Sequence, residues 1–202
     1  MKKKKIGLVI LILVLLYSIG GIYYNITHRD RVDNSVKSID KIDKYGYVLK
    51  SNATDLQKEL FSELKTILNS DNINDDDYAK AISKMFVTDL YTLSNKVNKY
   101  DVGGTEYVLE SGRDNFKVNV QDTLYKYLED NSDGKRSQIL PMVVSVSADE
   151  ISDTKYKIGD NESDAKKVSL TLSYNEDLGY DTKVTLILIK VDGKYYVVES
   201  AS

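Results

Sequence analysis

The clearest feature of the hydrophobic pattern is one apolar run near the start of the chain. Residues 6–24 carry no charged side chain, and positions 2–5 directly before them are all lysine. A helix rises about 1.5 Å per residue, so a run of this length crosses the hydrocarbon core of a bilayer. It predicts a transmembrane helix preceded by a cytoplasmic tail over residues 1–5, because basic residues stay on the cytoplasmic side. The anchoring residues are Ile6, Leu11, Leu16, Tyr23 and Tyr24, and the topology charges are Lys2, Lys3, Lys4 and Lys5.

A cleaved signal peptide is the alternative interpretation, since Ser18-Ile19-Gly20 offers small residues at the spacing of a cleavage site. The apolar core of a signal peptide usually measures about 7–15 residues, and the run here is longer. The pattern therefore favours an uncleaved anchor in the cell membrane, with the N-terminus in the cytoplasm and the C-terminal domain outside.

Residues 25–50 are mostly polar and are interpreted as a stalk or linker. Within 28–44, four isolated apolar residues stand three to four positions apart, which fits either a short amphipathic helix or an irregular chain. The segment 45–49 has the pattern of a short extended piece.

Three helices are predicted next, because apolar residues recur every three to four positions. The first covers about 54–69 and is preceded by serine, asparagine and threonine, which are good N-caps. The second begins after Asn74, has three aspartates in its first turn and is long enough to break near Leu93. The third covers about 114–130.

After residue 131 the apolar period drops from 3.6 to 2 and β-branched residues dominate, which predicts strands. We expect strands near 140–148, 155–158, 167–174, 182–191 and 195–200. Asp192-Gly193 predicts a two-residue hairpin turn, and the apolar run 184–189 predicts a central strand. Residues 51–202 should therefore form an α+β domain, with three helices packed on a curved antiparallel sheet of four to five strands.

Composition narrows the possible chemistry. The part of the chain after residue 28 holds 24 basic and 31 acidic residues, a net charge of −7, which argues against binding nucleic acid. Cysteine is absent, which excludes disulfides and cysteine-ligated metals, and the single histidine, His28, lies beside the predicted span. The folded domain therefore lacks the commonest general base and metal ligand.

No motif predicts a cofactor or metal. The acidic segment 71–77 has isoleucine at the third position of a calcium loop, so it is interpreted as a helix N-terminus. The segment 129–140 matches that loop better but ends in leucine where a bidentate glutamate is needed, so it is interpreted as a turn. Gly103-Gly104 lacks a following phosphate-binding lysine and is also a predicted turn. Serine–lysine pairs such as Ser83-Lys84 are expected by chance in this composition.

Tyrosine is abundant, with 16 residues, and five of them are candidates for lining a pocket. These are Tyr78, Tyr91, Tyr100, Tyr107 and Tyr127. Tyrosines at helical spacing more often lie at the edge of a core. No pair of carboxylates stands out, and no catalytic residue is assigned.

The order of elements resembles a known family. A short cytoplasmic tail, one transmembrane helix, a stalk, three helices and four or five strands is similar to the inner-membrane assembly factor of bacterial type IV secretion and conjugation systems. That resemblance implies the cone-shaped fold of nuclear transport factor two. The segments 86–94, 101–104, 114–117 and 122–127 also resemble anchored proteins of low-GC bacteria.

These observations lead to three functional hypotheses. The first is a non-enzymatic, membrane-anchored domain that binds other envelope proteins, or further copies of itself, as a scaffold. The second is an extracytoplasmic domain that binds a small ligand in the pocket of the cone. The third is a hydrolase or isomerase that works through aspartate and tyrosine.

Overall fold

The computed structural model describes residues 37–201, which belong to one compact unit of the chain. The expected tail 1–5, the expected anchor 6–24 and the first part of the expected stalk, 25–36, lie outside the described residues. Between residues 37 and 201, no helix combines the length and the apolar character that crossing a membrane requires.

The described residues form an α+β structure, as the sequence predicts. A two-stranded sheet pairs β1 with β2, and a four-stranded antiparallel sheet has the order β3-β4-β5-β6. In chain order the elements are β1 (Ser38–Ile42), β2 (Tyr47–Lys50), α2 (Asp55–Leu68), α3 (Asp75–Tyr91), η1 (Thr105–Tyr107), η2 (Glu110–Gly112), α4 (Arg113–Asp122), β3 (Val143–Ile158), β4 (Asn161–Tyr174), β5 (Lys183–Val191) and β6 (Lys194–Ala201).

Local sequence accounts for the first two helices. Thr54 caps α2 through a capping box, in which its side chain accepts from the Gln57 backbone while the Gln57 side chain accepts from the Thr54 backbone. Asn74 caps α3, and the three aspartates after it lie at the positive end of the helix. The predicted first helix and the start of the second are confirmed, and α3 ends at Tyr91, close to the expected break.

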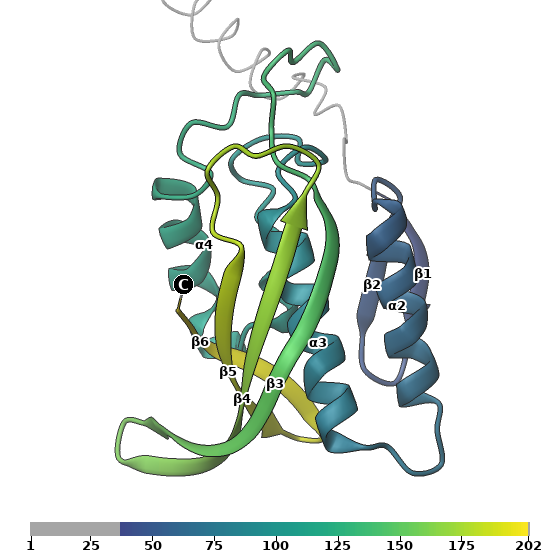
Figure 1. Ribbon diagram of the computed structural model, residues 1–202, viewed down its shortest axis with the longest axis vertical. Coiled ribbons are helices and arrows are strands. Elements are labelled where there is room, and N and C mark those ends of the chain that lie inside the picture. Colours follow the sequence, from purple (N-terminus) through teal and green to yellow (C-terminus); the bar gives the residue numbers. More distant parts are fainter. Residues whose placement is uncertain (1–36, 202) are drawn as a thin grey trace, which may run out of the picture. The chain divides into compact units, whose positions relative to one another are not determined.

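The helices form two layers on the sheet rather than one. Helix α3 packs on β3, β4 and β6, and α2 packs mainly on α3 (Figure 1). Because α3 lies between α2 and the sheet, its side chains are buried in several directions, and Ala79, Ile82 and Val87 are fully buried. One continuous core joins both sheets and all three helices.

The folded unit begins earlier than the sequence analysis predicted. Residues 38–42 and 47–50 form a β-hairpin instead of a stalk, and four of its apolar side chains enter the core. The hydroxyl groups of Tyr47 and Tyr78 lie 2.8 Å apart and form a hydrogen bond. The apolar spacing in 28–44 fitted either a helix or an irregular chain, but among the described residues, 38–42 form a strand. The short extended piece expected at 45–49 overlaps β2.

The third helix is shorter than predicted and ends at Asp122. Thr123 leaves the helical conformation, and the Tyr125 backbone N–H donates to the Val120 carbonyl at 2.8 Å, which turns the chain inward. The Tyr125 hydroxyl then donates to the Leu90 carbonyl at 2.7 Å. Anchoring of this buried tyrosine on α3 overrides the helical periodicity that the sequence shows.

Two predicted strands, 140–148 and 155–158, are parts of the single strand β3. The polar residues between them gave no strand pattern, because apolar and polar residues do not alternate in an edge strand that has both faces near solvent. The turn at Asp192-Gly193 is confirmed, and both residues have the positive φ that this hairpin requires. Strand β5 is central, as predicted from residues 184–189.

Candidate functional site

A buried polar network surrounds Asp89 near the C-terminal end of α3. The Asp89 carboxylate accepts from Lys96 Nζ at 2.6 Å and from Gln57 Nε2 at 3.1 Å on one oxygen. Its second oxygen accepts from the Gly104 backbone N–H at 2.7 Å. One side chain therefore joins α2, α3, the loop after α3 and the turn before η1.

The glycine pair 103–104 allows this arrangement. A Cβ on Gly103 would lie 2.1 Å from the Asp89 carbonyl oxygen, so no larger residue fits without a shift of the backbone. Gly104 has a φ of +74°, which favours glycine. The predicted turn at this pair is confirmed, and its role is to carry backbone over the end of α3.

The charges of the network balance one another. The Lys96 side chain is 2% exposed and that of Asp89 is 16% exposed, so this ion pair is nearly removed from water. Burial alone would raise the pKa of Asp89, but the charges of Lys96 and Lys50 and the hydrogen bonds lower it below its ordinary value. Removing either partner would leave an uncompensated buried charge.

Glu106 and Tyr107 meet this network from η1. Burial, followed by the charge of Asp89, raises the pKa of Glu106, and burial raises that of Tyr107 well above its ordinary value. The Tyr107 hydroxyl is buried, and the neighbouring Glu106 carboxyl also raises the pKa of Tyr107. A carboxyl with a raised pKa beside a tyrosine is a pairing that general acid–base catalysis uses.

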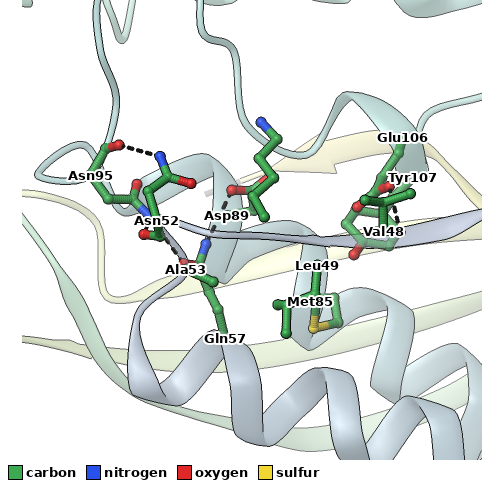
Figure 2. A pocket seen from close by; sticks show the side chains of 11 residues that line it. Val48, Leu49, Asn52, Ala53, Gln57, Met85, Asp89, Asn95, Glu106 and Tyr107 are labelled. Carbon is green, nitrogen blue, oxygen red and sulfur yellow. Dashed lines mark hydrogen bonds between the residues drawn. The ribbon is translucent and has the colours of Figure 1, made fainter. Parts of the chain in front are cut away.

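The cavity beside this network is small. Figure 2 shows Gln57 and Asp89 facing each other, with Asn52 and Asn95 nearby. The cavity that these residues share with Glu106 and Tyr107 has a volume of about 20 Å³. This is room for a single water-sized molecule and not for an organic substrate. We therefore interpret the Asp89 network as a set of contacts that holds α2, α3 and the following loops together.

The five tyrosines proposed as a pocket lining do not converge. Tyr78 and Tyr107 are buried in the core, where Tyr78 bonds Tyr47 and stacks edge-on with Tyr195. Tyr91 is partly exposed, and Tyr100 and Tyr127 are exposed. Continuation of the third helix would have put Tyr127 on the apolar face, but Tyr125 is buried in its place.

The sequence analysis also missed Asp89, although a signal was present. In α3 the positions 82, 85, 86 and 90 carry apolar, buried side chains, and position 89 lies on the same stripe. A carboxylate on an apolar stripe indicates a buried ion that needs a partner. Lys96 and Gln57 could not be paired with it from spacing alone, because they lie on other elements.

A second concavity is open and largely apolar. It lies among α4, the segment 108–112, the end of β3 and the end of β6, with a volume of about 350 Å³. We call it the α4–β6 groove. Its apolar lining consists of Phe86, Val108, Leu109, Phe116, Tyr156, Ile158, Val197 and Val198. Phe116 packs on Phe86 with ring centroids 5.8 Å apart, and Ile158 is 42% exposed. A volume of this size is typical of ligand sites.

The two edges of the four-stranded sheet differ. Edge strand β3 has two register shifts and several charged residues, including Asp149, Glu150 and Asp153, which are common protections against pairing with another chain. Edge strand β6 carries a single parallel bridge, between Val108 and Val197. Beyond it, residues 199–201 are exposed and have no bridge partner on the outer side within the described chain.

Among residues 37–201, no three acidic or histidine side chains gather in a way that could hold a metal ion. The two calcium-like segments have the structures that the sequence pattern favoured. Asn74 and the aspartates after it start α3, and residues 131–134 form a turn closed by Gly134.

Comparisons of this chain with protein-family models, curated proteins and solved structures find no match.

Proposed function

We propose that this chain is a membrane-anchored, non-enzymatic domain of the bacterial envelope that binds an extended, apolar segment of another envelope protein in the α4–β6 groove. The observation that carries the proposal is the end of β6 beside that groove, because its outer side has no strand partner among residues 37–201. An added strand could form backbone hydrogen bonds with residues 199–201, while its alternate side chains enter the apolar concavity.

The contrast between the two sheet edges supports this choice. Bulges and charges on β3 oppose the addition of another strand. The end of β6, in contrast, lines the same apolar groove as Phe116 and Ile158. The likeness to the assembly factor of type IV secretion systems, with its cone-like fold, is part of this proposal and rests on the order of elements along the chain. Fold likeness alone does not give function, so the groove carries the argument.

Photo-crosslinking in the native envelope tests this function. A photoreactive phenylalanine analogue at Ile158 in the full chain should form an adduct with an extended segment of a second protein, mapped by mass spectrometry. The same analogue at Val118, which is 55% exposed on α4 and does not line the groove, is the matched control. A Phe116→Asp change in the Ile158 variant should abolish the adduct, because it places a charge in the apolar lining.

A small apolar ligand is the second candidate, because the groove volume of about 350 Å³ lies within the range of small-molecule sites. In that case the adduct formed at Ile158 would add the mass of a small molecule or lipid. An adduct with a second copy of this chain would instead identify a homo-oligomer. Equal labelling from Ile158 and Val118 would refute the groove as a binding site.

A further inference from the structure

Three loops gather at the end of the folded unit where α3 finishes. They are residues 92–102, 123–142 and 175–182, and we call this surface the loop end. The Asn131 backbone N–H donates to the Val97 carbonyl at 2.8 Å, and the Leu93 N–H donates to the Pro141 carbonyl at 3.0 Å. The Asn175 backbone N–H likewise donates to the Met142 carbonyl at 3.0 Å. Figure 1 shows these loops together at the top of the view.

The loop end exposes large apolar side chains that the core does not use. Tyr127 is 78% exposed, Tyr100 is 68%, Ile139 is 67% and Leu178 is 40%. These are four of the nine large hydrophobic residues exposed in the described chain, and they include the three most exposed. Single exposed apolar residues are ordinary, but a concentration at one end indicates a surface that is covered in use.

Two of these exposed tyrosines have a lysine beside the ring. Lys99 Nζ lies 5.2 Å from the centre of the Tyr100 ring, and Lys126 Nζ lies 5.2 Å from the centre of the Tyr127 ring. Tyrosine prefers the headgroup region, with its ring toward lipid, and a neighbouring lysine can keep its ammonium in water. The same loops also expose acidic side chains, so attraction to anionic lipid is not the force that drives the contact. They are Glu129, Asp130, Asp133, Glu176, Asp177 and Asp181.

The chain enters the folded unit at this same end. The Lys37 carbonyl accepts from the Ser51 N–H at 2.7 Å, and Lys50 forms an ion pair with Asp101, the residue after Tyr100. In the sequence, 12 residues (25–36) separate the predicted span from Lys37. A fully extended tether of this length reaches about 40 Å, which holds the loop end at high local concentration near the bilayer.

We propose that the loop end docks on the outer surface of the lipid bilayer through Tyr100, Tyr127 and Ile139. The inference rests on the membrane anchoring in the proposed function, but it concerns a separate surface. Burial of apolar side chains drives the contact, so it should persist in zwitterionic lipid and at high salt.

Fluorescence quenching in nanodiscs tests this contact with the full chain. Because the chain has no cysteine, single cysteines introduced at Tyr127 or Ile139 can be labelled uniquely with an environment-sensitive dye. Phosphatidylcholine carrying a spin label near the headgroup should quench these dyes several times more than a dye at Asp160, which lies in the exposed turn between β3 and β4. The quenching at Ile139 should fall when Tyr100 and Tyr127 are both changed to serine.

The outcomes separate this inference from the proposed function. If the chain fails to enter nanodiscs, the anchoring is wrong and both proposals fail. If the chain enters but all three dyes are quenched equally, only the docking is wrong. A blue-shifted dye at Tyr127 without lipid quenching would show that protein covers the loop end, which also overturns the docking.

Discussion

At the residue scale, the two acidic side chains of the polar network respond to pH in opposite directions. The pKa of Asp89 is lowered, so its contribution to stability is present above its ordinary value of 3.8 and is lost as the pH falls through the lower folded value. The pKa of Glu106 is raised, so its contribution is complete below its ordinary value of 4.5 and is lost as the pH rises through the higher folded value. The two effects therefore occupy separate pH ranges.

Glu106→Gln should isolate the second effect. Glutamine cannot ionise, so the variant avoids the cost of burying a carboxylate beside Asp89. Its free energy of unfolding should rise relative to the parent chain as the pH increases above the ordinary value of 4.5. Urea unfolding at several pH values measures this difference. Glu110→Gln, at an exposed position on η2, should run parallel to the parent chain. If the pH dependence of unfolding for Glu106→Gln also ran parallel to that of the parent chain, the raised pKa of Glu106 would be contradicted.

Gly103→Ala should destabilise the fold by about 1–3 kcal/mol, because the new Cβ would overlap the Asp89 carbonyl oxygen and the chain must shift to relieve the overlap. The shift would also disturb the bond from Gly104 to the Asp89 carboxylate. Gly112→Ala is the matched control, since its Cβ would meet only Val108 Cγ1 at an ordinary 3.9 Å. Equal midpoints of denaturant unfolding for both variants would show that the turn is not tightly fitted.

At the element scale, the sequence predicts structure wherever local signals decide it. Helix α2 has a capping residue and a regular apolar face, and the β5–β6 turn needs positive φ at Asp192 and Gly193. These elements follow from nearest neighbours in the chain. The α+β class follows as well, because the order of helices and strands is visible in the change of period.

Distant contacts determine what the sequence could not show. The β1–β2 hairpin is fixed by the hydrogen bond between the hydroxyl groups of Tyr47 and Tyr78. Helix α4 ends where the Tyr125 hydroxyl donates a hydrogen bond to the Leu90 carbonyl. Asp89 is identifiable as an unusual residue, but its partners come from α2 and from two loops. The α4–β6 groove depends on how the end of β3 lies near α4, and no periodicity in the sequence encodes that arrangement.

At the scale of the whole molecule, the hairpin before α2 is part of the cooperative unit. Its core side chains are Ile42, Tyr45, Tyr47 and Leu49. Lys194 Nζ also donates to the Tyr45 carbonyl at 2.6 Å, which links the hairpin to the start of β6. A boundary at residue 51, as the sequence pattern predicts, would therefore cut through the core.

Two fragments test this boundary. A fragment of residues 37–202 should fold and unfold cooperatively, whereas residues 51–202 should lack cooperative unfolding in urea. Each lost core side chain costs about 1.5–3 kcal/mol, and four such losses approach the 5–15 kcal/mol that typically stabilises a whole domain. Ile39→Ser in the longer fragment is the control, because Ile39 is 55% exposed on β1 and its change should leave the midpoint nearly unchanged. Matching transitions for the two fragments would show that the hairpin only rests on a domain that is complete without it.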